Sequence, residues 1–490
     1  MTLEIELKLE IDPRDLQLIG QDPFLAGAES RSNQQLTIYY DTPETKLKKH
    51  GFTLRVRSAG GRFTQTIKPI SDSVGLVARE EIECEVASIQ PDLGSLSRHP
   101  FRALLDNGEL DRLQPIVRSD VNRTSWKLDR ANGQVQIDLD HGTVSAGERS
   151  DEFAELEFEL LDGRPESLFA AARRLSDYVP VRLGVLTKAE RGFLLAAGSS
   201  GKINKVAPVR VRPDMTVAES FEMIVHACLK HYRLNETLVI NERKAGALHQ
   251  ARVAMRRLRS AFSLFRPAIE DVEFQHLRHE LRWFTGQLGD ARNLDVYLER
   301  DLEEQERARL IRKREKAYDK VAEAMDSSNF RRLLIDLVGW TALGAWRSGK
   351  MATRPIESFA EHRLDRLWES IAGADGRLAR MDESTRHELR IQVKKLRYAI
   401  EFLRGLYPHA RAAEKRFASA VAELQETLGK LNDLITASTL STAPAEEGWL
   451  IGSLDERRHV RAAEEALREA LQVGPFWRRR KVEKSVRPLV

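Results

Sequence analysis

Short stretches in which apolar and polar residues alternate recur through the first 195 residues of the chain. Successive side chains of a strand face opposite ways, so this alternation predicts strands that are apolar on one face. Turn residues such as Gly60-Gly61 and Asn132-Gly133 separate the stretches, as in antiparallel sheets. The predicted strands are 4–10, 36–40, 52–57, 63–68, 79–86, 135–140 and 155–160, with helices near 15–20 and 165–178.

The pattern changes after residues 196–215, where Gly, Ser and Pro cluster and periodicity is lost. From about Thr216 to Leu471 apolar residues recur with helical spacing. The stretch from His249 to Arg259 is repeated from His387 to Arg397, which indicates a duplicated helical bundle. We therefore expect an α+β chain with a strand domain at 1–197, a linker at 198–215, an all-α domain at 216–480 and a basic tail at 481–490.

The formal net charge of +4 hides an asymmetry between the two parts of the chain. Residues 1–200 contain 25 Lys and Arg against 32 Asp and Glu, whereas residues 201–490 contain 53 against 42. An acidic part can hold cations, and a basic part can hold a polyanion. The chain therefore combines two kinds of site.

The polar faces of the predicted strands are charged. On one strand this pattern is typical of a solvated surface, but its recurrence indicates a barrel with a polar lumen and an apolar exterior covered by helices. Carboxylates are the ligands that Mg²⁺ and Mn²⁺ prefer, and Arg and Lys hold phosphate oxygens, so such a lumen suits a metal-bridged triphosphate. The residues that share charged faces are Glu4, Glu6, Lys8 and Glu10; Arg55 and Arg57; Arg79, Glu81 and Glu83; Asp138 and Asp140; and Glu155, Glu157 and Glu159.

The motif Glu4-x-Glu6-x-Lys8 resembles the N-terminal ExExK motif of the CYTH domain, also called the triphosphate tunnel metalloenzymes. Further matches follow in order across about residues 1–197. They are 39–42 (YYDT), 54–57 (LRVR), 65–68 (QTIK), Arg79-x-Glu81-x-Glu83, Ser119-Asp120-x-x-Arg123, 139–142 (LDHG), 155–159 (ELEFE) and 188–192 (KAERG). The resemblance implies an eight-stranded antiparallel tunnel whose members hydrolyse or rearrange triphosphates with Mg²⁺ or Mn²⁺.

The resemblance also implies roles for individual residues. Gln136 stands where many relatives have glutamate and Asp138 where they often have a small residue, so the carboxylate set is shifted by one strand position here. This leaves both Asp138 and Asp140 open as ligands, and of the two only Asp140 is retained among the implied ligands. The expected chemistry is metal-assisted attack of water, with no side chain assigned as general base. The implied phosphate-holding residues are Lys8, Arg55, Arg57, Lys68, Arg79, Arg123 and Lys188, and the implied metal ligands are Glu4, Glu6, Glu81, Glu83, Asp140, Glu157 and Glu159.

The helical part carries two basic stripes. His249, Arg252, Arg256 and Arg259 lie three, four and three residues apart, which places them along one helix face. Like charges at this spacing repel, and no glutamate along the stripe relieves them, so an anionic partner is favoured over a solvated face. Aromatic residues are not interleaved, which favours inorganic polyphosphate over nucleic acid. His387, Arg390, Lys394 and Arg397 repeat the stripe, and Arg257 and Lys395 flank the two copies.

The stripes, together with the segment Leu288–Asp295, resemble the CHAD domain over about residues 216–480. Asn293 replaces an aspartate that is frequent in that family. The resemblance implies two four-helix bundles whose basic surface binds inorganic polyphosphate, in some members at polyphosphate granules.

The leading interpretation is an inorganic triphosphatase that releases pyrophosphate and phosphate. Two alternatives remain at this point: a polyphosphate-binding or granule protein without turnover, and a tunnel enzyme acting on an organic triphosphate, of the adenylate cyclase or thiamine triphosphatase type. We expect a cytoplasmic protein without a membrane partner. The N-terminus lacks a signal-peptide pattern, and the most apolar stretch, Leu333–Trp346, is shorter than a membrane span.

Overall fold

The computed structural model describes residues 3–25, 27–70, 74–80, 82–92, 94, 110–130, 133–440 and 445–478. The chain divides into two compact units, and each is described by itself. The first contains residues 1–207, 225–256 and 272–345, and the second contains residues 208–224, 257–271 and 346–490. The first unit therefore joins the whole sheet to the beginning of the helical part.

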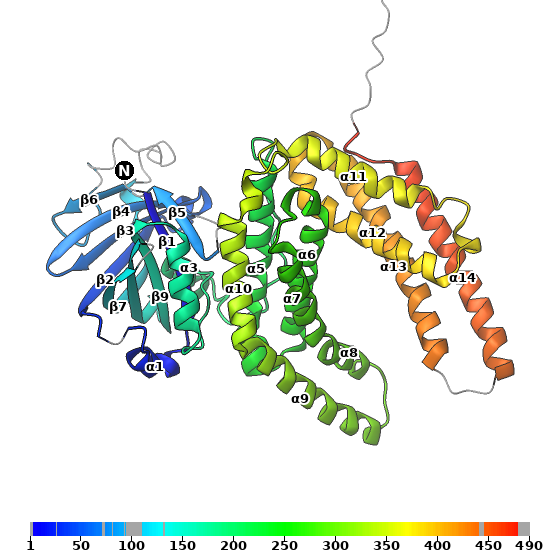
Figure 1. Ribbon diagram of the computed structural model, residues 1–490, viewed down its shortest axis with the longest axis horizontal. Helices are drawn as coiled ribbons and strands as arrows, with labels where there is room; N and C mark the ends of the chain where they lie inside the picture. The colour runs from blue at the N-terminus through cyan, green and yellow to red at the C-terminus, as the bar shows by residue number, and fades with distance from the viewer. Residues whose placement is uncertain are drawn as a thin grey trace, which may run out of the picture. The chain divides into compact units, whose positions relative to one another are not determined.

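The strands form one antiparallel sheet in the order β10-β1-β9-β8-β7-β2-β3-β4-β6, and β5 pairs with the free side of β1. The segment 76–86 thus reaches both ends of the ladder, through β5 at β1 and through β6 at β4, so the sheet curls into a tunnel (Figure 1). The strands are β1 (Leu3–Ile11), β2 (Ser30–Asp41), β3 (Phe52–Ala59), β4 (Arg62–Pro69), β5 (Leu76–Glu80), β6 (Ile82–Val86), β7 (Gln114–Arg130), β8 (Gly133–Ala146), β9 (Arg149–Gly163) and β10 (Arg182–Leu183).

The predicted fold class, an antiparallel tunnel followed by a helical domain, is confirmed. The count of ten described strands differs from the predicted eight for two local reasons. The segment predicted as one strand at 79–86 contributes to two described strands, β5 and β6, and β10 is a two-residue pairing with β1. Strand β7 was not among the strands expected from alternation, because its polar residues do not follow a regular period of two.

The outer face of the tunnel is apolar and packs against helices. Leu156 and Phe158 of β9 are fully buried, and so are Leu7 and Leu9 of β1. Helix α3 (Glu166–Ser176) lies against β8 and β9, and Figure 1 shows it beside β9. Helix α4 (Lys188–Ala196) lies against β7, β8 and β9. Short helices α1 (Leu16–Gln21) and α2 (Lys46–Lys49) flank the strands. The apolar face is thereby removed from water, while the charged face lines the interior.

Helix α4 approaches strand β7 so closely that only glycine fits at one position. A Cβ at Gly192 would lie 2.1 Å from Cγ1 of Val117. Alanine in place of a helical glycine normally stabilises by about 1 kcal/mol, but overpacking here costs about 1–3 kcal/mol. We expect Gly192→Ala to lower the melting temperature in calorimetry. Gly20→Ala in α1, where nothing lies within 4 Å, is the control and should not lower it.

The helical part of the first unit is built on aromatic packing. The ring of Tyr232 meets the rings of Phe284 and Phe330 edge-on at 5.7 and 5.5 Å. The helices that contribute to this part are α5 (Val217–Glu242), α6 (Ala245–Ile269), α7 (Phe274–Gln287), α8 (Gly289–Leu298), α9 (Glu304–Asp326) and α10 (Ser328–Leu343).

The second unit contains α11 (Ile356–Ala372), α12 (Glu383–Leu403), α13 (Arg411–Leu440) and α14 (Ala445–Val473). Phe417 packs against Trp368 and Trp477, and the indole N–H of Trp477 donates to Asp365 at 3.0 Å. The aromatic residues near the C-terminus therefore belong to this unit's core. No described helix has the length and apolar character needed to cross a membrane.

Candidate active site

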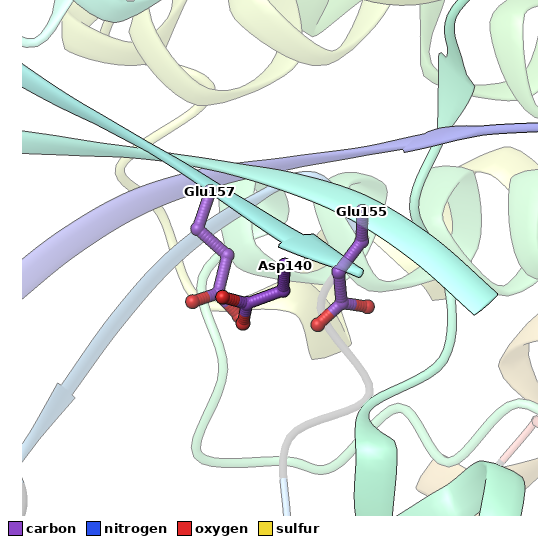
Figure 2. Close-up of side chains that lie close together, drawn as sticks. All are labelled: Asp140, Glu155 and Glu157. Carbon is purple, nitrogen blue, oxygen red and sulfur yellow. The ribbon is translucent and has the colours of Figure 1, made fainter. Parts of the chain in front are cut away.

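The register of β1, β8 and β9 collects charged side chains on one face of the sheet. Lys8 lies opposite Glu157 across β1 and β9. Asp140 lies opposite Glu155 across β8 and β9, and Arg123 of β7 lies opposite Asp140. Directly opposed residues share a face, so these side chains meet in the tunnel. Figure 2 shows the carboxylates of Asp140, Glu155 and Glu157 close together, with one oxygen of each within 4.8 Å of the others.

Three cations hold this carboxylate trio. Lys8 Nζ lies 3.2 Å from Glu155 and 2.8 Å from Glu157. Lys188, the first residue of α4, lies 2.7 Å from Asp140 and 3.2 Å from Glu157 and also pairs with Glu155. Arg123 pairs with Asp140 at 2.6 Å and Glu157 at 2.5 Å. The trio of Asp140, Glu155 and Glu157 is therefore neutralised by the chain's own side chains.

The electrostatics keep these pairs charged. Burial alone would raise the pKa of Glu157, but Lys188, Lys8 and Arg123 outweigh it and hold that pKa well below its usual value. Burial alone would lower the pKa of Lys8, but Glu155, Glu157 and Glu6 hold it above its usual value. A metal ion at the trio would have to displace Lys8 or Lys188. The trio has the donor atoms that a metal needs. In the described structure, however, its carboxylates are already ion-paired with Lys8, Lys188 and Arg123.

A second set of carboxylates lies on the same face with less compensation from cations. Glu6 lies opposite Glu159 across β1 and β9. Burial and the charges of Asp138 and Glu6 raise the pKa of Glu159, and the charge of Arg123 offsets only part of this rise. Within the described ranges no cation is ion-paired with Glu6 or Glu159. Carboxylates that repel each other are stabilised by a divalent cation, so this pair fits a metal better than the ion-paired trio does.

Arginines gather on β3 beside the carboxylates. Repulsion from Arg55, then burial, then repulsion from Arg123 lower the pKa of Arg57 to about 10. The buried Nε of Arg57 has no hydrogen-bond partner among the residues that the structure describes. Arg55 lies 3.8 Å from Glu83, whose carboxylate also accepts from the hydroxyl of Thr66. A phosphate oxygen near Arg57 would satisfy the donor and relieve the repulsion.

The structure brings together most of the predicted tunnel residues that it describes. Lys8, Arg123, Lys188, Asp140 and Glu157 form one network, Glu6 and Glu159 form a pair, and Lys68 is half-buried on β4. Glu83 is half exposed and associates with Arg55 instead of the other carboxylates. Glu4 and Arg79 are backbone partners in the register of β1 and β5, but their side chains lie outside the described residues, as does all of Glu81.

Two residues of the network were missing from the predicted site. Glu155 is fully buried between Lys8 and Lys188, and Asp138 pairs with Arg123 at 2.7 Å. The amide of Gln136 donates to Asp138 at 3.1 Å, which helps to hold this carboxylate beside Arg123. The alternation of Glu155, Glu157 and Glu159 was the signal that pointed to Glu155.

The first basic stripe is crowded with positive charge. Burial and the charges of Arg292, Arg256 and Arg252 lower the pKa of His249. Burial and the charges of Arg256 and Arg292 lower the pKa of Arg252. Arg292, which α8 contributes, was not among the predicted contacts although it lies in the segment Leu288–Asp295. An anion would relieve this repulsion.

The second stripe lies on α12. His387 is exposed, and Arg390, Lys394 and Arg397 are half-buried. Lys395 lines a pocket of about 240 Å³ with Arg363 and Arg366. Arg259, the last residue of the first stripe, is exposed.

Arg257 departs from the prediction. Its side chain is 1% exposed, pairs with Glu401 at 2.8 Å and stacks over the ring of Phe402. The residue lies between the buried Ala254 and Ala261 on the apolar face of α6, so it cannot present its charge to a polyanion at the surface.

Known protein families match both parts of the chain. The CYTH domain matches residues 2–193, and the CHAD domain matches residues 223–442. The chain carries a CYTH domain followed by a CHAD domain. The tunnel network described above lies within the CYTH domain, and both basic stripes lie within the CHAD domain.

Three relatives illustrate the likeness. An inorganic triphosphatase of Haemophilus influenzae is 32% identical over 205 residues, which span 40% of this chain and 56% of that protein. An uncharacterized protein of Mycobacterium tuberculosis is 24% identical over 94% of this chain and 92% of its own length. The crystal structure of the CHAD domain from the plant Ricinus communis covers 56% of this chain and 98% of its own, with 27% identity and a TM-score of 0.45.

Proposed function

We propose that the CYTH tunnel hydrolyses inorganic triphosphate to pyrophosphate and phosphate with the help of Mg²⁺ or Mn²⁺. One observation carries the proposal: the tunnel holds cations and carboxylates whose charges its own residues leave unbalanced. Arg57 is repelled by Arg55 and Arg123, and Glu159 is repelled by Asp138 and Glu6. A polyanion bound together with a divalent cation satisfies both sets at once. The similarity to a triphosphatase of Haemophilus influenzae supports this choice.

The roles follow from the contacts. Glu6 and Glu159, with Glu4 by its place in the motif, would hold the metal, which supplies neutralisation of charge on the phosphate oxygens. Arg55 and Arg57 of β3 would hold phosphate oxygens. Phosphoryl transfer depends mainly on positioning and electrostatic stabilisation.

The mechanism also uses the fixed positive charges of Lys8, Lys188 and Arg123. Each is fixed by two or more carboxylates, so each positive charge stands at a set location before substrate arrives. Preorganised charges need no rearrangement during the reaction, which is what makes them effective.

A substrate comparison tests the proposal. The full chain is incubated with Mg²⁺ or Mn²⁺ and equal concentrations of inorganic triphosphate, ATP, thiamine triphosphate or long-chain polyphosphate, and phosphate release is followed. Inorganic triphosphate should be hydrolysed with the highest kcat/KM. A higher kcat/KM for ATP or thiamine triphosphate would instead assign the tunnel to an organic triphosphate.

The CHAD domain is proposed to bind inorganic polyphosphate through its basic stripes. The repulsion that His249 and Arg252 experience supports an anionic partner. Binding to a flexible polyanion releases counterions and therefore weakens as salt rises, by roughly 0.7 in the log–log slope for each phosphate contact. Tethering polyphosphate beside the tunnel would raise its local concentration there.

Removing cations from the first stripe should weaken this binding and flatten its salt dependence. The double variant Arg252→Gln/Arg256→Gln is expected to reduce the slope by roughly 1–2 in titrations of long-chain polyphosphate. Arg243→Gln is the control, because Arg243 is already paired with Glu315 and Asp319. An unchanged slope in the double variant would mean that this stripe does not contact polyphosphate.

A further inference from the structure

A buried ion network joins the tunnel wall to helix α5 of the CHAD domain, and all of it lies in the first compact unit. Arg233 of α5 is 3% exposed and pairs with Glu10 of β1 at 2.9 Å. Its Nε donates to the carbonyl of Leu183 at 2.8 Å, and it also pairs with Glu236. Glu10 in turn pairs with Arg191 of α4 at 2.8 Å. One CHAD-domain side chain thus contacts β1 and β10 directly, and α4 through Glu10.

These elements carry the cations of the tunnel network. Glu10 lies two residues after Lys8 on β1 and opposite Glu155, the carboxylate that Lys8 and Lys188 share. Arg191 lies one turn after Lys188 on α4. The position of Glu10 therefore fixes both the strand of Lys8 and the helix of Lys188.

A second contact from α5 reaches the start of α4. Lys230 pairs with Glu190 at 2.7 Å. Glu190 closes a capping box with Thr187, which sets where α4 begins. Lys188 is the first residue after this cap, so the Lys230–Glu190 pair acts on the backbone that carries the tunnel lysine.

Stability alone does not account for this network. Apolar packing is also present at this place: α10 contacts β10, and the buried Leu9, Leu183, Phe330 and Leu334 line one small pocket. Buried ion pairs contribute little net stability compared with apolar packing, but they fix one arrangement of the groups they join. The ion pairs of Arg233 are therefore better explained by fixing the arrangement of these elements than by adding stability.

We propose that Arg233, with Lys230, is a positioning residue of the CHAD domain for the tunnel reaction: it holds β1 and α4 so that Lys8 and Lys188 stand where substrate phosphates bind. This inference rests on the proposed function of the tunnel. The first part of the CHAD domain would then help to hold the active site in place. A misplaced catalytic charge costs rate more than it costs binding, because Arg55 and Arg57 still hold the substrate.

The test compares four full-length variants: Arg233→Gln, Arg233→Lys, Lys230→Gln and the control Arg243→Gln, whose ion pairs lie elsewhere on the helical part. Circular dichroism confirms folding before assay. For triphosphate hydrolysis we expect kcat to fall about tenfold in Arg233→Gln and about threefold in Lys230→Gln, with KM changed less than about twofold. Arg233→Lys should recover part of the loss, and Arg243→Gln should match the wild type.

A double-mutant cycle separates positioning from general damage. If Arg233 acts through Lys8 and Lys188, adding Arg233→Gln to the double variant Lys8→Met/Lys188→Met should lower kcat by less than about twofold further. An additive tenfold loss, or a kcat in Arg233→Gln equal to that of the wild type, would overturn the inference. Should Arg233→Gln fail to fold, the same cycle with Lys230→Gln decides.

Failure of the proposed function has a different signature. A wild type that releases no phosphate from triphosphate refutes the hydrolysis. A wild type that does release phosphate, together with additive losses in the cycle, overturns only the positioning role of Arg233 and leaves the hydrolysis standing.

Discussion

Replacing Arg57 with methionine is expected to reduce kcat for inorganic triphosphate by roughly 10²–10³-fold, the usual cost of removing one preorganised charge from a water-poor site. The same change should leave the protein at least as stable as the wild type. Arg57 is repelled by Arg55 and Arg123, so its removal relieves strain in the substrate-free tunnel. Phosphate release and the melting temperature measure the two effects.

The matched control is Arg118→Met. Arg118 lies on β7 like Arg123, but it is half exposed and pairs with Asp120 at 2.7 Å. Its loss should change kcat less than about twofold, because exposed ion pairs contribute little. A large loss of stability in Arg57→Met, or a kcat close to that of the wild type, would show that Arg57 is a structural residue.

Replacing Glu6 and Glu159 together with glutamine is expected to weaken Mn²⁺ binding by more than about 100-fold, since loss of even an outer partner of a metal ligand costs 10–100-fold. Without metal, the double variant should melt at a higher temperature than the wild type, because the repulsion that raises the pKa of Glu159 is gone. The stabilisation that Mn²⁺ gives the wild type should disappear. Metal titrations followed by melting temperature report both changes.

Glu152→Gln is the control for this variant. Glu152 lies on β9 with Glu159, but it is 60% exposed and contacts His141. Full stabilisation by Mn²⁺ in Glu6→Gln/Glu159→Gln would place the metal elsewhere. The trio of Asp140, Glu155 and Glu157 would then be the next candidate, tested by Asp140→Asn.

The alternation in β1 is strong enough to predict the strand and the face that Glu6 and Lys8 share. It cannot predict that Lys8 meets Glu155 and Glu157, because that pairing joins residues far apart in the chain. The expectation of a closed tunnel came from the resemblance to the CYTH domain. The neutralisation of the trio by Lys8, Lys188 and Arg123 became visible only with the register of β7, β8 and β9.

For two features that the sequence analysis did not predict, the sequence nevertheless contains a local signal. Helix α4 was not expected, although Thr187-x-x-Glu190 has the spacing of a capping box just before it. Arg257 was expected at the surface, although the flanking Ala254 and Ala261 place it on the apolar face of α6. In contrast, nothing in the sequence around Arg233 indicates that this helix residue pairs with a strand of the other domain. That contact is set by tertiary packing.

The most direct test of the tunnel's hydrolytic role is phosphate release from inorganic triphosphate by the full chain, with and without Mg²⁺ or Mn²⁺. We expect release that requires the divalent cation, is lost in Arg57→Met and in Glu6→Gln/Glu159→Gln, and persists in Arg118→Met and Glu152→Gln. Absence of release from the wild type, with tight binding of polyphosphate, would contradict the hydrolytic role and make the chain a polyphosphate-binding protein.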